Sequence, residues 1–317
     1  MVGATEEKNA EPAKTSRARS VRKLGIVLSA IYLAVLGYFC IRFSVLPGPE
    51  FVVLSFLIYA LYAKWAQRFL KDWVPFIVLF LAFEAMRGIP SGVFGVVHYT
   101  ELASVELRIF GTIPTLVLQE FFRSTFLDYF GAFFYSLHFI IPTVFAFVLW
   151  KFSNKDYWKY VCALLLCSYA ALITAMLYPS APPWLAHPLP GVSLPATRVL
   201  YQVDAELNVP FYRTIFGLFE SDPYAAFPSL HAAYPWLVSL YAIRIKRLKA
   251  LPVLVLPVCV WFSAVYLGEH YVIDLVGGIA YSTCAFFVVE RLFLRFSKSG
   301  AVRRLGGLFS KPVVQRE

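Results

Sequence analysis

The sequence contains no long polar block that could fold as a separate soluble domain, and only 15% of its 317 residues are charged. Hydrophobic residues make up 59% of the chain, and the mean hydropathy is +0.66. This composition is too apolar for a soluble domain and indicates a polytopic membrane protein.

The N-terminal segment also lacks the features of a cleaved signal peptide. Its first 20 residues are polar and mixed in charge, and no small-residue cleavage site follows the first apolar run. We expect residues 1–23 to form a disordered cytoplasmic tail, residues 24–296 to form the transmembrane domain, and residues 297–317 to form a second cytoplasmic tail.

Cysteine is scarce, and no cysteine belongs to a motif with metal-ligand spacing. The five cysteines all lie inside apolar runs; they are Cys40, Cys162, Cys167, Cys259 and Cys284. We expect them to pack as small hydrophobic residues, and we predict neither disulfides nor thiolate ligands. Internal repeats are absent as well.

Eight apolar runs are candidate membrane spans, so the expected fold is all-α, a polytopic membrane protein with about eight transmembrane helices. They cover approximately residues 24–43, 51–63, 73–86, 132–150, 160–178, 234–243, 251–267 and 275–294. Several are shorter than the ~20 residues that cross a bilayer comfortably. Their boundaries must therefore extend, or the bilayer must thin around them.

The basic residues predict the orientation of these spans. With the N-terminus in the cytoplasm, 23 of the 29 Lys and Arg residues fall on cytoplasmic segments or inner span ends. The positive-inside rule then places both termini in the cytoplasm. Because the basic residues are spread over several short segments, we expect membrane lipids as partners and no nucleic acid.

Ionisable groups of the other kinds gather on the extracytoplasmic side. In this topology, 12 of the 19 acidic residues and all five histidines fall outside or in the outer half of a span. Two long outer segments could cover them. The first, residues 87–128, has apolar residues among charges and suggests an interfacial amphipathic helix. The second, residues 179–230, is rich in Pro and Gly.

The most informative stretch runs from Phe227 to Asp274. It opens with Phe-Pro-Ser-Leu-His, ending at His231, and closes with His-Tyr-Val-Ile-Asp, beginning at His270. Between them, the basic residues 244–249 separate two apolar runs and predict a cytoplasmic hairpin turn. A hairpin of this kind brings both histidines back to the outer side of the membrane.

The spacing of these residues predicts acid–base and nucleophilic chemistry. Asp274 lies four residues after His270, on the same helix face, so it can accept a hydrogen bond from one ring nitrogen and leave the other as a nucleophile. His231 can act as general acid and then as general base. Backbone N–H groups at the helix start around Ser229 suit a phosphate oxyanion. We expect no metal and no cofactor, although these three side chains could nominally bind a metal, and each histidine alone could be structural.

These residues resemble the type 2 phosphatidic acid phosphatase superfamily, and its inositol phosphorylceramide synthase branch in particular. The matching motifs are Ala181–Trp184, Phe227–His231, Tyr266–Asp274 and Tyr135-x-x-His138-Phe139-x-x-Pro142, within roughly residues 128–278. The resemblance implies a six-helix core, a nucleophilic His270, an orienting Asp274 and an acid/base His231.

The sequence departs from the superfamily pattern in its cations. Ala264 stands where the third signature usually has an arginine, and the first signature has no good match. A phosphate still needs cationic partners, and only outer arginines are available. We predict that Arg87 and Arg213 bind phosphate, although snorkelling to lipid head groups is an equal alternative. His138 is a candidate for positioning the acceptor.

The sequence therefore predicts that the transmembrane domain is catalytic and transfers a phospho-headgroup, such as phosphoinositol, through a phosphohistidine. The expected partners are a phospholipid donor and a lipid alcohol acceptor, with the site facing the extracytoplasmic side. The alternative reaction is hydrolysis of a lipid phosphate or polyprenyl phosphate. A carrier of anionic ligands is a third hypothesis, which lacks a matching cluster on the inner side.

Overall fold

The computed structural model describes residues 27–38 except 29 and 36, and residues 49–62, 65–89, 95–208, 210–218 and 222–298. Within these ranges the regular elements are helices, with only isolated β-bridges besides. The chain divides into two compact units, residues 1–78 and 79–317. The predicted N-terminal tail lies outside the described residues, as does the C-terminal tail after Lys298.

The α-helices are α2 (Pro49–Tyr62), α3 (Ala66–Arg87), α4 (Glu101–Phe110), α5 (Pro114–Phe121), α6 (Thr125–Phe152), α7 (Asn154–Leu177), α8 (Val199–Leu207), α9 (Phe211–Leu218), α10 (Leu230–Lys246), α11 (Val255–Tyr266) and α12 (Val272–Lys298). Two 3-10 helices, η1 (Pro183–Leu185) and η2 (Arg247–Leu254), complete the described elements.

The first unit is held together by aromatic packing between α2 and the first half of α3. The fully buried Trp73 ring stacks on Phe69 with centroids 5.1 Å apart and meets the edge of Phe56 at 5.9 Å. Such ring pairs contribute about 0.5–1.5 kcal/mol beyond the area that they bury. Aromatic residues of α2 and of the first half of α3 therefore form the core of this unit.

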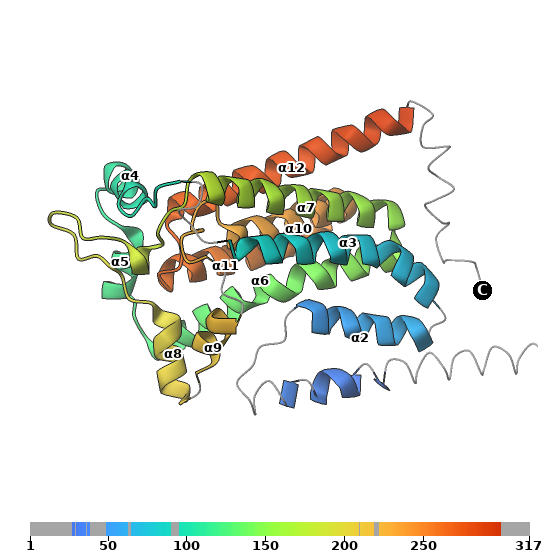
Figure 1. Cartoon of the computed structure of the whole chain (residues 1–317), viewed down its shortest axis with the longest axis horizontal. Coiled ribbons are helices and arrows are strands. Elements are labelled where there is room, and N and C mark those ends of the chain that lie inside the picture. Colours follow the sequence, from blue (N-terminus) through green and yellow to red (C-terminus); the bar gives the residue numbers. More distant parts are fainter. Residues whose placement is uncertain are drawn as a thin grey trace, which may run out of the picture. The chain divides into compact units, whose positions relative to one another are not determined.

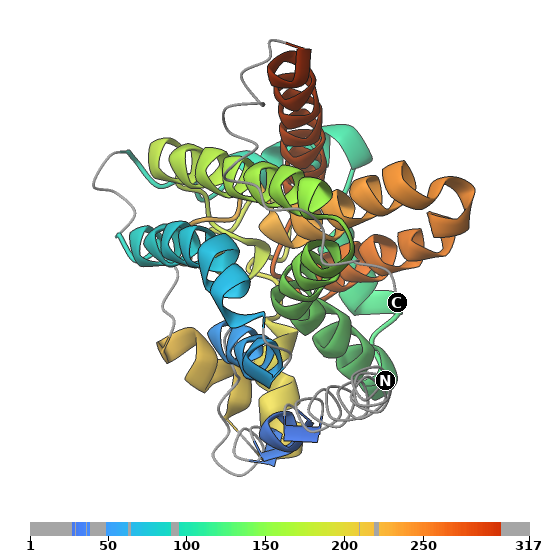
Figure 2. The same ribbon diagram turned by 90° about the vertical axis from the view of Figure 1, so that its right-hand side faces the viewer.

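The second unit contains the long helices that follow. Helix α12 packs against α7 and α10, while α6 packs against α7, α10 and α11. These helices run side by side, and the short helices α4, α5, α8 and α9 gather at one end of them (Figures 1 and 2). The bundle thus presents one end that is covered by loops and short helices, where the predicted outer segments lie.

Three helical stretches in the described part of the chain are long and apolar enough to cross a membrane. They are Asn154–Leu177, Leu230–Tyr266 and Val272–Arg295, and the second of them comprises α10, η2 and α11. The two halves of α6, bent by 43° after His138, would make a fourth. Pro142 explains this bend, because it cannot donate a backbone hydrogen bond to the carbonyl of His138. These helices indicate an integral membrane protein. The finer expectation of about eight spans stays a prediction.

The predicted hairpin is present. The indole N–H of Trp261 on α11 donates to the carbonyl of Ala232 on α10 (3.3 Å), and the Trp236 and Trp261 rings lie 5.7 Å apart. The basic turn is not irregular, since residues 247–254 form η2. The hairpin returns the chain to the end at which it started, so His231 and His270 lie at the same end of the bundle.

Helices α10 and α12 approach closely because α12 carries two glycines near its start. A Cβ atom on Gly278 would lie 2.1 Å from the backbone oxygen of Ser229, and one on Gly277 would lie 2.5 Å from the Phe227 ring. A larger residue at Gly278 would require the backbone to move, and one at Gly277 would require the Phe227 ring to move. The two glycines therefore set the distance between the two motifs.

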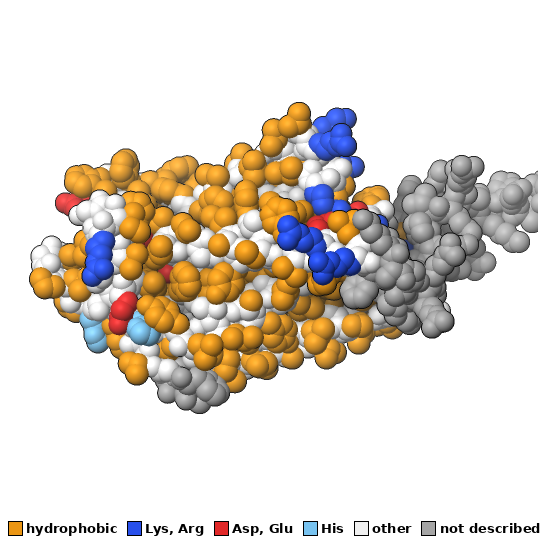
Figure 3. Space-filling model, turned by 90° about the horizontal axis from the view of Figure 1, so that it is seen from above, with side chains coloured by type: hydrophobic (Ala, Val, Ile, Leu, Met, Phe, Trp, Pro, Cys, Tyr) orange, Lys and Arg blue, Asp and Glu red, His pale blue; other side chains and the backbone are white. Residues whose placement is uncertain are grey.

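At the end of the bundle away from His231 and His270, ion pairs join α7, α10 and α12. Lys159 on α7 pairs with Glu290 on α12 at 2.6 Å, and Arg244 on α10 bonds both Asp156 and Glu290. In Figure 3, most Lys and Arg side chains in view lie in the right half of the picture, the His side chains in view lie near its left end, and most of the surface between them is hydrophobic. This distribution agrees with the charge pattern of the sequence.

Residues 87–128 contain a helix, α4, where an interfacial amphipathic helix was predicted, and its position at a membrane interface stays a prediction. Leu102 and Ala103 face the core, while Ile109 and Phe110 are exposed at 59% and 47%. The exposed side chains form the apolar face that an interfacial helix needs.

We predict that Gly278→Ala destabilises the protein, because its methyl group overlaps the Ser229 carbonyl. Overpacking of this kind typically costs about 1–3 kcal/mol. Thermal unfolding in detergent should show a lower midpoint for this variant. Gly88→Ala is the control, since its added Cβ would meet only the Ala85 oxygen at 3.5 Å. Equal midpoints for the two variants would contradict the close-contact argument.

Candidate active site

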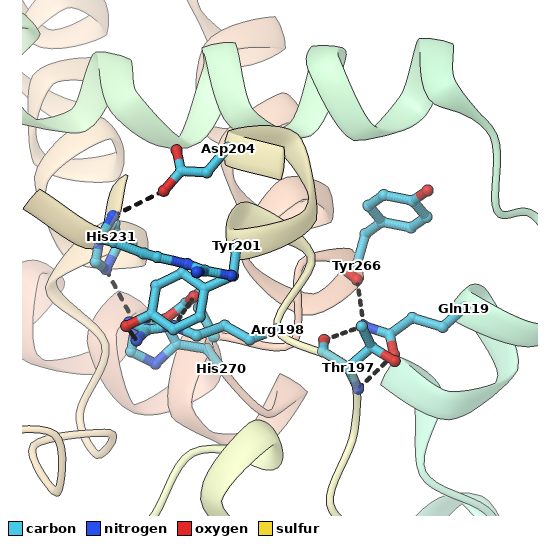
Figure 4. A network of polar contacts seen from close by, with 10 residues as sticks. Gln119, Thr197, Arg198, Tyr201, Asp204, His231, Tyr266 and His270 are labelled. Atoms are coloured by element: carbon cyan, nitrogen blue, oxygen red, sulfur yellow. Dashed lines mark hydrogen bonds and ion pairs between the residues drawn. The ribbon is translucent and has the colours of Figure 1, made fainter. Parts of the chain in front are cut away.

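The two predicted catalytic histidines are in direct contact. His231 lies in the first turn of α10, and His270 lies in the turn before α12. Nδ1 of His231 is 3.0 Å from Nε2 of His270, which is hydrogen-bond distance. Figure 4 shows the two rings meeting from different parts of the chain. The structure therefore brings together two residues that are 39 positions apart in the sequence.

Asp274 lies on the other side of the His270 ring. Its Oδ2 is 3.4 Å from Nδ1 of His270 and accepts the backbone N–H of Tyr271 at 2.8 Å. The Asp274 side chain is fully buried, and its backbone carbonyl accepts the N–H of Ser229 at 3.0 Å. Asp274 therefore holds the His270 turn with its side chain and the start of the His231 motif with its backbone.

This arrangement favours one assignment of protons. An ionised Asp274 accepts, so it favours a proton on Nδ1 of His270 and leaves a lone pair on Nε2. The bond between the rings then needs the proton on Nδ1 of His231, which donates to that lone pair. In this tautomer, the lone pair of the predicted nucleophile and the proton of the predicted general acid face each other across 3.0 Å.

His138 and Tyr135, both on α6, enclose His231 from the other side. The Tyr135 ring stacks on His231 with centroids 4.0 Å apart, and the His138 ring centroid lies 3.7 Å from that of His231. Nδ1 of His138 donates to the carbonyl of Tyr135 at 3.1 Å. The predicted His138 thus lies beside the acid/base residue, whereas Tyr135 was noted in the sequence only as part of a motif.

Ser229 has a different position from the one expected of a phosphate ligand. It is fully buried, its Oγ accepts the N–H of Ala232 as the N-cap of α10, and its own N–H donates to Asp274. Both groups are thus used inside the protein, and the structure supports a capping role for the side chain. Its predicted part in phosphate binding stays a prediction.

Of the two predicted arginines, Arg87 is paired within its own helix and Arg213 is close to an aromatic ring. Arg87 donates to Glu84 at 2.8 Å, and its charge interacts with His138 and His231. The Arg213 guanidinium lies over the Tyr201 ring at 5.1 Å, and its backbone N–H donates to Asp204. Only the Arg87 charge is seen to act on the histidines, and the phosphate-binding roles of both arginines stay predictions.

The structure adds a third arginine that the sequence did not single out. Arg198 forks onto the carboxylate of Glu269, with Nε to Oε1 at 2.8 Å and Nη2 to Oε2 at 3.3 Å, and donates to the Tyr201 hydroxyl at 2.6 Å (Figure 4). Burial lowers the pKa of Arg198, but the Glu269 carboxylate outweighs burial and raises it overall. Glu269 precedes His270 directly, so this pair lies beside the predicted nucleophile. Arg198 could have been identified from the sequence only by its predicted outer position and by the position of Glu269 next to His270.

Gln119 on α5 fixes the backbone next to this arginine. Its side-chain amide donates to the carbonyls of Thr197 and Tyr266, both at 2.9 Å, and its carbonyl accepts the N–H of Thr197 at 3.0 Å. Gly268, at φ +82°, allows the close approach, since a Cβ there would meet the Thr197 oxygen at 2.6 Å. The segments before Arg198 and before His270 are therefore fixed to each other.

In the described ranges, no group of three or more His, Cys, Asp or Glu side chains is arranged to hold a metal ion. The expectation that the reaction needs no metal stays a prediction.

Comparison with known proteins identifies related sequences. A family model described as the PAP2 superfamily matches residues 100–288. The phosphoinositol dihydroceramide synthase of Bacteroides thetaiotaomicron is 28% identical over 220 residues, which cover 65% of this chain and 72% of that protein. No solved structure gives a match.

Fungal proteins are also similar. The inositol phosphorylceramide synthase of Candida albicans is 28% identical over 52% of this chain, and the catalytic subunit of Schizosaccharomyces pombe is 26% identical over 53%. These matches cover only 36% and 41% of the fungal proteins.

The family match confirms the resemblance read from the motifs. It covers more than half of the chain and includes His138, His231, His270 and Asp274. Together with the apolar helices, it identifies the chain as an integral membrane enzyme that belongs to the PAP2 superfamily of lipid phosphatases and phosphotransferases.

Proposed function

We propose that the protein transfers a phospho-headgroup, such as phosphoinositol, from a glycerophospholipid to the hydroxyl group of a lipid acceptor. The observation that carries the proposal is the contact between Nδ1 of His231 and Nε2 of His270, with Asp274 on the far side of the His270 ring. The names of the similar synthases support the choice of phosphoinositol as the headgroup and of a lipid as the acceptor.

The first step uses the two facing nitrogens. Phosphate enters between the rings, and the Nε2 lone pair of His270 attacks phosphorus while the bond to the diacylglycerol oxygen breaks. For this step His231 must carry protons on both ring nitrogens; it gives its Nδ1 proton to that leaving oxygen and becomes neutral. The resulting phosphohistidine carries the headgroup, and the Asp274 carboxylate stabilises the positive ring that forms.

The second step reverses the proton transfer. His231, now neutral, takes the proton of the acceptor hydroxyl as the oxygen attacks phosphorus. The phosphorus–nitrogen bond breaks, and the electron pair returns to Nε2 of His270. With water in place of the lipid hydroxyl, the same steps give hydrolysis, which is the alternative reaction.

The cations proposed for the phosphate differ from the superfamily pattern. Ala264 is fully buried, and its carbonyl accepts the N–H groups of Glu269 and His270, both at 3.1 Å. We propose that Arg198, held by Glu269, directs N–H donors toward the phosphate from α8, and that Arg213 supplies net positive charge.

The two arginines should respond differently to substitution. Arg198→Lys cannot fork onto Glu269 and bond Tyr201 together, so we expect at least a roughly tenfold loss of kcat. Arg213→Gln should mainly raise the KM for the donor, while Arg213→Lys should restore it. Kinetics on a labelled phospholipid donor measure both effects. Arg108→Gln, on the exposed face of α4, is the control, and a loss as large in the control would contradict specific roles.

The central test follows the products and the covalent intermediate. Purified protein is incubated with labelled phospholipid donors, with and without a lipid alcohol. We expect more transfer product than hydrolysis product when the alcohol is present, and activity that persists in EDTA. His270→Ala should abolish turnover and the trapped phosphoenzyme, His231→Ala should slow its release, and Asp274→Asn should abolish turnover in a folded protein.

Three results would contradict this scheme. Full activity of His270→Ala would exclude the phosphohistidine. Loss of activity in EDTA with recovery on adding a divalent metal would replace it with a metal route. Free headgroup phosphate as the main product with every acceptor would establish the hydrolase.

The proposed orientation places both termini in the cytoplasm and the site on the extracytoplasmic side. Ser193→Cys, in the exposed loop before α8, should react with an impermeant thiol reagent added outside intact membranes, and Lys249→Cys in η2 should not. The parent chain without an added cysteine measures the background from the native thiols. The reverse labelling pattern would place the site in the cytoplasm.

A further inference from the structure

Glu106 is a buried carboxylate that the proposed reaction does not use. It lies on α4, among the short helices at the end of the bundle, and is 0% exposed. Burying a carboxylate is costly unless it has partners, so its position requires a reason. Its neighbour Glu101 on the same helix is exposed and pairs with His98 at 2.9 Å.

The partners of Glu106 are the first backbone donors of α12. Its Oε1 accepts the N–H of Val272 at 2.5 Å and lies 3.4 Å from the N of Ile273. The first N–H groups of a helix have no partners within that helix. Because Asp274 accepts the N–H of Tyr271, two carboxylates from different helices together cap the start of α12.

Three polar atoms of the residues at this cap have no hydrogen-bond partner in the described part of the chain. They are Oε2 of Glu106, Oδ1 of Asp274 and the hydroxyl of Tyr271, all buried. The three groups also interact electrostatically with one another. Buried polar atoms are seldom unsatisfied, and two neighbouring carboxylates seldom both ionise, so one of the two holds a proton.

The proton belongs on Glu106. Burial raises the pKa of Glu106 to about 7; the Asp274 charge adds to this rise, and the N–H donors of Val272 and Ile273 oppose it. Asp274 has the His270 ring as a partner for its negative charge, whereas Glu106 pairs with no cation within the described ranges. Two further titratable side chains belong to this region. They are Tyr271, in the turn before α12, and Tyr178, which packs against the apolar cluster that contains Tyr271.

We propose that Glu106 is a positioning residue for the nucleophile: in its protonated form it holds the start of α12, so that Asp274 faces His270 as the single charged carboxylate behind the ring. The inference rests on the proposed function, since it assigns to Glu106 the task of aligning the His270 nucleophile. It connects α4, which the sequence presents as an interfacial helix, to the catalytic step.

Two substitutions separate the parts of this role. Glu106→Gln keeps a carbonyl oxygen for the two N–H groups and stays neutral, whereas Glu106→Leu loses the acceptor. On the labelled glycerophospholipid that the wild type turns over fastest, Glu106→Leu should lower kcat roughly 10- to 100-fold with little change in KM, as expected for residues that orient catalytic groups. Glu106→Gln should stay close to the wild type, as should the control Glu101→Gln.

The pH profile tests the protonation state. Because the pKa of Glu106 is raised to about 7, the carboxyl is neutral below that pH and becomes charged beside Asp274 above it. Wild-type kcat should therefore fall as the pH rises through about 7, and Glu106→Gln should remove this fall. A Gln variant as inactive as the Leu variant, or one with the wild-type pH profile, would overturn the proposal.

Hydrogen exchange gives a readout that does not depend on turnover. The amides of Val272 and Ile273 should lose protection in Glu106→Leu and keep it in Glu106→Gln, with unfolding midpoints recorded for both. Normal protection in a folded Leu variant would overturn the inference even if no donor is turned over. If the Leu variant does not fold, the pH profile and exchange of the Gln variant decide. Absence of a phosphohistidine in the wild type, with these amides behaving as expected, would reject only the proposed function.

Discussion

The contact between the His231 and His270 rings depends on most of the structure around it. Each ring lies at the end of a different helix, and the 3.0 Å separation of their nitrogens holds only if α10 and α12 approach closely. The α10–η2–α11 hairpin returns the chain to the same end, and Gly278 allows the backbone contact that sets the distance. Asp274 then bonds both motifs, through its side chain and through its carbonyl. Catalytic geometry and helix packing are thus parts of one constraint.

The second constraint is the cost of burying charged and polar groups near a bilayer. The structure meets it by giving buried carboxylates defined partners: Glu269 has Arg198, Asp274 has His270 and a backbone N–H, and Glu106 has the start of α12. Ion pairs among α7, α10 and α12 do the same at the other end of the bundle. The charged residues are therefore concentrated at the two ends, and the flank between them is apolar.

Sequence patterns predicted the parts of this arrangement that depend on local spacing. The hairpin, the shared end of the two histidines and the pairing of His270 with Asp274 follow from apolar runs, a basic turn and an i,i+4 spacing. The partners that come from distant elements could not be predicted. Arg198 reaches Glu269 across 71 residues and Glu106 reaches Val272 across 166, and no local pattern encodes such contacts. Ser229 shows the converse: its motif position was recognised, but only the structure shows that its polar groups are used within the protein.

The cations around the site favour one kind of phosphate. Arg87 and Arg198 are each paired with a carboxylate, Glu84 and Glu269, so they offer directed donors but little net charge. Arg213 forms no ion pair with the residues that the structure describes. A phosphate monoester carries about −1.5 to −2 charges at neutral pH, whereas the diester of a glycerophospholipid carries a single charge. A site with mostly neutralised arginines matches the diester better, because a second negative charge in a buried site would lack a partner. Ala264, which stands where the superfamily pattern has an arginine, adds no positive charge and is consistent with the proposed phosphodiester donor.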